Sequence, residues 1–145
     1  MINRLTADLV WSWHPCSLYS RARIDGIYGV HGLTPLRVCD LPDISAKDKL
    51  WTLLREEVLP AATLRLLACR WGATAVDAAQ MARWAAAWTV AVAAAQAAGR
   101  DAAWTAARGG ARETAATTAW QAAEAAAWEA QLADVRNILA EDEHD

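Results

Sequence analysis

Phenylalanine is absent from the 145 residues, and proline is scarce, with four in the chain and none after Pro60. A hydrophobic core must therefore be built mainly from leucine and from tryptophan, which occurs nine times. Because proline interrupts helices, its absence after Pro60 permits long unbroken helices in the second half. The length is typical of one domain, and we expect a single domain over residues 1–145.

Cysteine is also scarce, with only Cys16, Cys39 and Cys69, an odd number that gives no disulfide framework. Free thiols favour a reducing compartment, so we expect a cytoplasmic protein. The first ten residues, MINRLTADLV, lack the charged start and apolar run of a secretory signal. The uncharged stretch 84–99 is rich in alanine and shorter than the roughly 20 residues that cross a bilayer. We therefore expect no membrane partner.

Basic residues are not in excess, because the formal net charge is −3. Residues 1–72 contain nine Lys/Arg against seven Asp/Glu, and residues 73–145 contain five against ten. Proteins that bind nucleic acid usually carry a basic patch or stripe. The small positive excess of the first half is too weak for that, and we expect no nucleic-acid partner.

Residues that could support catalysis or bind a metal are few and poorly spaced. His14 and Cys16 flank a single residue, whereas zinc sites pair their ligands at C-x2-4-C or H-x3-5-H spacing. Cys16 or Cys39 could be activated by His31, but nothing in the spacing requires it. The stretch 26–32 lacks the G-x-G-x-x-G pattern and the lysine of phosphate-binding loops. We expect no catalytic residue, metal or cofactor; a small Cys/His-dependent enzyme is the weaker alternative.

The dominant pattern is an eight-residue repeat over residues 76–131, in which the fourth position is alanine in all seven units. The fifth position reads Gln80, Trp88, Gln96, Trp104, Arg112, Trp120 and Trp128. Alanine is the best helix former, so the repeat predicts helices. Eight residues leave a remainder of about 80° on a helix, so the fifth position moves around the axis from unit to unit.

Glycine is expected to break this repeat in two places. Gly99 is predicted to end a first helix over 74–98, and the Gly-Gly pair at 109–110 is the stronger break. Residues 101–108 are then a short helical connector, and a second long helix covers 111–140.

The first half divides into two parts. Residues 1–43 show no sustained period, and their prolines and glycines predict a loop-rich lead-in with one short helix at 17–24. Two amphipathic stretches joined at Pro60 predict a central helical hairpin over 45–72. The predicted fold is thus all-α, with the long Ala/Trp-rich helices of 74–140 packed against the hairpin as a bundle.

Two helix starts are marked by capping residues. Thr34 precedes Pro35 and suits the N-cap, with the proline at the first helical position. Ser45 precedes the apolar run of the hairpin and suits the same role. Trp51 and Trp71 are expected to be buried and to join the hairpin to the long helices.

Residues 33–72, LTPLRVCDLPDISAKDKLWTLLREEVLPAATLRLLACRWG, resemble a group of uncharacterised phage and bacterial proteins with Ala-Trp-Arg repeats. The matching positions are Thr34-Pro35-Leu36, Asp48-Lys49-Leu50-Trp51, Leu54-Arg55-Glu56-Glu57, Pro60, Leu64 and Leu67-Ala68-Cys69. Arg65 departs from the group, which has histidine there. The group is similar to proteins labelled as immunity proteins, a label that rests on context. The resemblance implies a role in phage–host conflict, as an immunity protein or an inhibitor of bacterial defence such as an anti-CRISPR, and it supplies no catalytic residue.

Trp104 is the member of the repeat least able to share an apolar face with the others. On an unbroken helix it would lie about 160° from Trp88, and Arg100 and Arg108 flank it one turn away on either side. A tryptophan between two arginines is typical of an anchor for an acidic partner surface. The alternative is that Trp104 fills the helix junction.

These patterns favour a non-enzymatic protein-interaction module that binds and blocks a protein partner. The predicted partner-binding residues are Trp104, Arg100, Arg108, Trp88 and Trp120. A purely structural or self-associating helical protein is the alternative from a different class.

Overall fold

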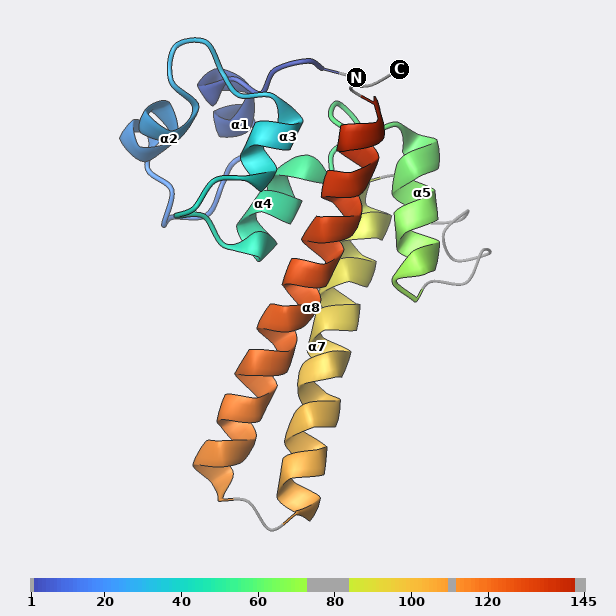
Figure 1. Ribbon diagram of the computed structural model, residues 1–145. Helices are drawn as coiled ribbons and strands as arrows, with labels where there is room; N and C mark the ends of the chain where they lie inside the picture. The colour runs from blue at the N-terminus through green and yellow to red at the C-terminus, as the bar shows by residue number, and fades with distance from the viewer. Residues whose placement is uncertain (1, 73–83, 110–111, 143–145) are drawn as a thin grey trace.

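The computed structural model describes residues 2–72, 84–109 and 112–142. Over these residues the chain is helical and has no strand; Leu5 and Leu33 form one isolated antiparallel bridge. The helices are α1 (Ala7–Ser12), α2 (Arg21–Tyr28), α3 (Pro35–Cys39), α4 (Ala46–Leu53), α5 (Ala61–Arg70), α7 (Trp84–Arg108) and α8 (Glu113–Asp142) (Figure 1). The predicted all-α class is confirmed.

The two longest helices, α7 and α8, run antiparallel as a hairpin (Figure 1). Helices α1 to α5 surround only one end of this hairpin, and together with that end they form the body of the molecule. Ala87, Ala91 and Ala95 recur every four residues on α7 and are fully buried, so the two helix axes can approach closely. Across the seam, the buried Gln131 of α8 donates from Nε2 to the Ala91 carbonyl oxygen at 3.2 Å. The other half of the hairpin projects away from the body.

The predicted helix end at Gly99 is wrong, because α7 continues through it to Arg108. A Cβ atom at Gly99 would lie 2.9 Å from Cε2 of Trp120, so the glycine makes room for the indole ring of the facing helix. The predicted connector over 101–108 is therefore the last part of α7. Helix α7 ends at Arg108, directly before the break predicted at the Gly-Gly pair; Gly110 and the predicted start of the first long helix near residue 74 lie outside the described residues.

The N-terminal segment contains three short helices, whereas the sequence predicted one at 17–24 and a helix start at Thr34. Side chains of Thr6, Ser20 and Thr34 cap α1, α2 and α3 by accepting a hydrogen bond from the amide three residues on. The predicted cap and first-turn proline at Thr34 and Pro35 are confirmed. Helices of five to eight residues are too short for a hydrophobic period to be recognised, which explains why α1 was missed.

The two helices predicted for residues 45–72 are present as α4 and α5, and Ser45 is the N-cap of α4 as predicted. Helix α4 ends at Leu53, and the following turn buries Leu54, Val58 and Leu59 completely. The predicted pairing of these helices as a hairpin joined at Pro60 is wrong, because α4 ends before that proline and each helix packs mainly on the long hairpin, α4 on α8 and α5 on α7. Helices α4 and α5 therefore pack on the end of the α7–α8 hairpin that belongs to the body.

The expected burial of Trp51 and Trp71 is only partly correct, because both rings are half-buried. Trp71 does join α5 to α8, since its indole Nε1 donates to Asp134 at 2.8 Å. Trp51 instead faces the N-terminal segment, where it packs edge-on against Trp13 at 6.4 Å between ring centroids. The guanidinium of Arg55 lies over both rings, at 5.0 Å from Trp13 and 4.4 Å from Trp51. The aromatic cluster thus holds the N-terminal segment against α4.

Candidate protein-interaction surface

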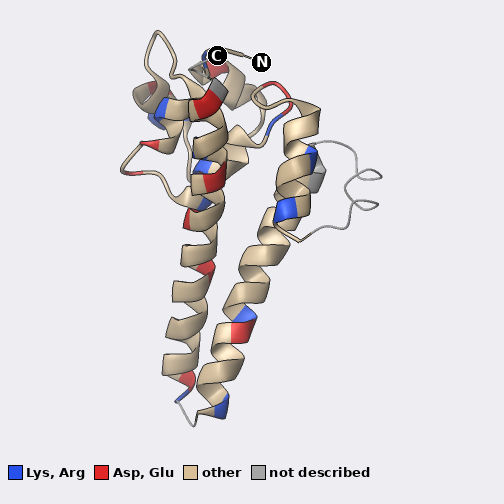
Figure 2. Cartoon of the chain, turned by 45° about the vertical axis from the view of Figure 1, so that its right-hand side comes forward, with Lys and Arg blue, Asp and Glu red and all other residues tan. Residues whose placement is uncertain are grey.

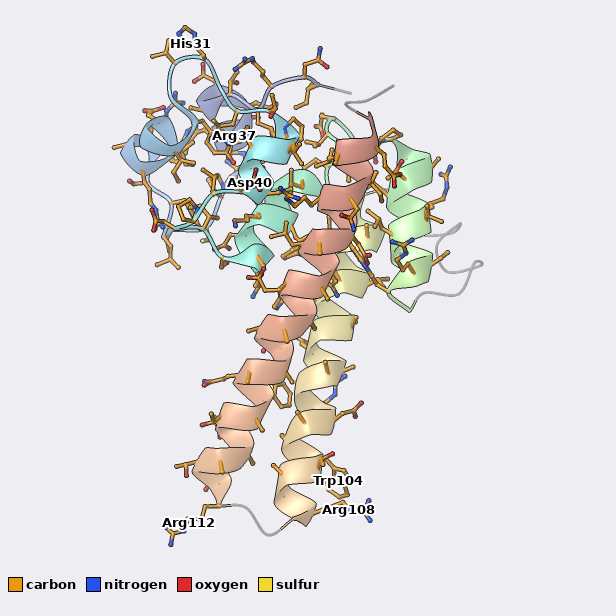
Figure 3. All side chains as sticks on the ribbon, viewed as in Figure 1. His31, Arg37, Asp40, Trp104, Arg108 and Arg112 are labelled. Atoms are coloured by element: carbon orange, nitrogen blue, oxygen red, sulfur yellow. The ribbon has the colours of Figure 1, made fainter. Side chains whose placement is uncertain are left out.

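The projecting end of the hairpin carries an exposed aromatic residue with basic neighbours. We call residues 100–109 and 112–119 the hairpin tip. Trp104 is 66% exposed, although tryptophan is usually mostly buried in folded proteins. Its ring and the Arg108 side chain extend from the outer side of α7, and Arg112 lies at the start of α8 (Figure 3).

The direction of Trp104 follows from the continuity of α7. Trp88 faces α8, where its ring stacks on Trp128 at 5.6 Å between centroids and 27° between planes. Sixteen residues further along an unbroken helix, a side chain lies about 160° from that direction. Trp104 must therefore point away from α8.

Arg100 and Arg108 lie one turn before and one turn after Trp104 on the same helix, and all three residues are exposed. The structure therefore brings these three predicted residues together on one strip of α7. No helix of the body reaches this strip in Figure 1, so the ring and both guanidinium groups are open to solvent.

The other two predicted residues lie elsewhere. Trp120 is half-buried in the seam of the hairpin against Gly99, and its Nε1 donates to Glu124 on the same helix at 3.0 Å. Trp88 is half-buried near the body, stacked on Trp128. Neither shares the outer strip of α7, so these two tryptophans pack the hairpin together and the strip around Trp104 is the exposed part.

Arg112 belongs to the hairpin tip but was not among the predicted residues. It is exposed just before α8, at the end of the molecule where Arg108 also lies (Figure 3). Its place in the fifth position of the repeat, where tryptophan or glutamine stands in most other units, was the available signal. The antiparallel arrangement of α7 and α8 places both arginines at the same end of the molecule (Figure 3).

The charge of the hairpin tip differs from that of the chain as a whole. Its described residues include three arginines against Asp101 and Glu113, which gives +1, whereas the whole chain carries −3. Long parts of both helices are uncharged, so these groups are isolated on the surface (Figure 2). A partner with an acidic surface would be attracted to this end of the molecule.

The cysteine and histidine residues considered for catalysis do not gather with the hairpin tip. Cys39 is buried in α3, and burial raises the pKa of its thiol to about 11, so it is protonated and weakly nucleophilic at neutral pH. His31 is exposed at the outer end of the α2–α3 loop (Figure 3). His14 and Cys16 are also exposed. Within the described ranges, no three His, Cys, Asp or Glu side chains are grouped closely enough to hold a metal ion.

Across the part of the chain that the structure describes, none of the helices has both the length and the apolar character needed to traverse a bilayer. Comparisons with protein-family models, with curated proteins and with solved structures give no match to this chain.

Proposed function

We propose that the protein is a non-enzymatic interaction module that presents the hairpin tip to an acidic surface of a partner protein. One observation carries this proposal: Trp104 is 66% exposed on a projecting hairpin, between two exposed arginines. Tryptophan and arginine are the residues most enriched among those that dominate the energy of protein interfaces.

The ring of Trp104 gains hydrophobic stabilisation only when another surface covers it, because nothing in the described fold does so. The arginines can pair with carboxylates in a bidentate manner and orient the partner around the ring. The packing of Trp120 against Gly99 holds the two helices in register next to this strip, on the side towards the body. A surface held in place before binding loses less conformational entropy when the complex forms.

The biological setting that we propose is phage–host conflict in the cytoplasm, as an immunity protein or an inhibitor of a bacterial defence system such as an anti-CRISPR. This part of the proposal is supported by the resemblance of residues 33–72. The mechanism is occlusion, in which the hairpin covers a functional surface of the partner and requires no chemistry of its own.

The test compares single substitutions in one capture experiment. The tagged protein and its Trp104→Ala variant are incubated with lysate of the native host, and bound proteins are identified by mass spectrometry. We expect Trp104→Ala to lose a partner that the wild type retains, at an unchanged melting temperature. Trp11→Ala is the matched control, because Trp11 is 42% exposed on α1, in the body.

Charge reversal tests the acidic character of the partner. Arg108→Glu should weaken capture, whereas Arg37→Glu on α3 should not, since Arg37 is exposed at the opposite end of the molecule (Figure 3). Capture that survives both Trp104→Ala and Arg108→Glu would contradict the proposal. If the captured species is the protein itself, the self-associating alternative replaces it, which light scattering on the purified protein would show.

A further inference from the structure

A second candidate site lies in the body, far from the hairpin tip. The N-terminal segment folds over α4, and a partly open cavity of about 450 Å³ lies between them. This volume is within the range of roughly 300–1,000 Å³ that is typical of small-molecule sites. The walls are mainly apolar and include Val10, Ile24, Ile27, Leu41, Trp51 and Trp88.

The side of α4 that lines this cavity is polar. Ser45, at the N-cap, and Asp48, Lys49 and Thr52 of α4 all line it, and their spacing places them on one face of the helix. An ordinary surface helix turns such a face to solvent, but here Lys49 and Thr52 are buried and the face borders a cavity with mainly apolar walls. Polar groups that converge in an apolar cavity are the usual composition of a ligand site.

The carboxylate of Asp48 already has partners within the chain. Its Oδ2 accepts hydrogen bonds from the Tyr19 hydroxyl and from the Ser45 hydroxyl, each at 2.8 Å. The Ser45 hydroxyl in turn accepts from the Asp48 amide and caps α4. Asp48 therefore serves to fix the start of α4 and the position of Tyr19.

The ammonium group of Lys49 has fewer partners within the chain. Only 9% of the residue is exposed, and its Nζ donates to the Cys39 carbonyl oxygen at 3.0 Å. An ammonium group has three donors, and within the described ranges no carboxylate lies within ion-pairing distance of this one. A buried charge without a counter-charge is costly. An anion in the cavity would supply the missing partner.

The distribution of lysine in the chain points the same way. The sequence contains two lysines, Lys47 and Lys49, among fourteen basic residues, and both line this cavity. Lys47 is exposed, and its Nζ lies 5.9 Å from the ring centroid of Trp128, on α8. Two ammonium groups against the single carboxylate of Asp48 leave the charged lining at +1. This balance selects a singly charged anion.

We infer that the cavity binds a small amphipathic carboxylate, with its anionic group at Lys49 and its apolar body against Ile24, Ile27 and Trp51. This site is independent of the proposed interaction at the hairpin tip.

Lysine labelling gives a direct test, because protein grown with ε-¹³C-lysine has only two labelled side chains. The protein is titrated with octanoate and, separately, with the neutral 1-octanol, and the two signals are followed by nuclear magnetic resonance; Lys47→Arg assigns them. We expect octanoate to move the Lys49 signal to saturation and 1-octanol to bind roughly tenfold more weakly, because it lacks the charge-assisted hydrogen bond. A Lys49 signal that does not saturate, or equal affinity for both compounds, would overturn the inference.

Two variants sharpen the result. Lys49→Met keeps the length of the side chain without its charge and should abolish the preference for octanoate, whereas Arg37→Met, outside the cavity, should preserve it. Ile44→Trp replaces a half-buried aliphatic side chain of the cavity lining with a larger indole ring and should reduce the affinity for both compounds. If Lys49→Met does not fold, the comparison of octanoate with 1-octanol on the wild type decides. Unchanged octanoate affinity in folded Lys49→Met would contradict the site.

Discussion

The eight-residue repeat contributes to both ends of the α7–α8 hairpin, although α8 continues beyond it after residue 131, and the two ends differ in what surrounds them. In the body, α4 and α5 cover the hairpin, and Trp128, Leu132 and Val135 of α8 are buried. At the hairpin tip only two helices are present, and Trp104 is exposed. The repeat determines that both ends are helical and closely packed. Whether a tryptophan at the fifth position of the repeat is buried depends on whether a third helix is available to cover it.

Replacing the buried tryptophan of the repeat should have the largest effect. Trp128 is 5% exposed and stacks on Trp88, so Trp128→Ala should lower the free energy of unfolding by roughly 3–5 kcal/mol. This is a large part of the roughly 5–15 kcal/mol of a whole domain. Denaturant unfolding measures the loss. A change below about 1 kcal/mol would show that the stacked pair is not part of the core.

The seam of the hairpin can be tested with Gly99→Ala. The added methyl group would meet three atoms of the Trp120 ring at 2.9 to 3.1 Å, and such overpacking costs roughly 1–3 kcal/mol. Alanine's better helix propensity offsets about 1 kcal/mol of that cost. We expect a net loss of about 1 kcal/mol of unfolding free energy.

Gly26→Ala is the matched control, because Gly26 also lies within a helix and a Cβ there would meet nothing within 4 Å. It should stabilise the protein by up to about 1 kcal/mol. An equal increase in unfolding free energy for Gly26→Ala and Gly99→Ala would show that the Trp120 ring can move aside without destabilising the hairpin.

The stability of the body should also decrease at alkaline pH. Partial burial and the hydrogen bond to Asp48 raise the pKa of Tyr19 to about 12 from an ordinary 10.0. Because the folded state holds this proton more tightly, the stabilisation is complete below pH 10 and is lost as the pH rises towards 12. Solvent screening at the half-exposed ring keeps the effect smaller than that of Trp128→Ala.

Ultraviolet titration of tyrosinate can follow this directly, since Tyr19 and Tyr28 are the only tyrosines. Burial raises the pKa of Tyr28 as well, so we expect little ionisation at pH 10 in the folded protein. Tyr19→Phe should flatten the decline of stability between pH 10 and 12. Half-ionised tyrosine at pH 10 in native conditions would contradict the Tyr19–Asp48 bond.

The smallest effect on stability is expected at the hairpin tip. Trp104→Ala should change the free energy of unfolding by no more than about 0.5 kcal/mol, as is usual for exposed positions. It removes the same side chain from the same position of the repeat as Trp128→Ala. The difference in unfolding free energy between the two variants therefore reports the different surroundings of the two tryptophans. A loss of several kcal/mol would mean that Trp104 packs the hairpin.

Features that depend on neighbouring residues could be predicted from the sequence. Thr34 and Ser45 mark helix starts because their hydroxyl groups accept hydrogen bonds from the amides three residues on, and Pro35 suits the first position of a helix. Helix α7 ends at Arg108, directly before the Gly-Gly pair of the sequence. Gly99 could not be interpreted in this way, because its role depends on Trp120 of the facing helix. A glycine that ends a helix and one that admits a ring look the same in a sequence.

The candidate sites show the same limit. The outward direction of Trp104 follows from the helical angle only because α7 continues through Gly99, which the sequence did not predict. The inward places of Trp88 and Trp120 required the position of α8. Lys49 reads as part of the polar face of an amphipathic helix. It is buried because the N-terminal segment folds over α4. That segment has no hydrophobic period from which its position could be predicted.

The projecting hairpin has a geometric consequence for the number of repeat units. One further unit on each helix would lengthen the hairpin by about 12 Å and leave the body unaltered. Because eight residues advance the helix by about 80° beyond whole turns, the outermost tryptophan would then face a different side of the molecule. The number of units therefore sets both how far the outermost tryptophan lies from the body and the direction in which it points, and the two change together.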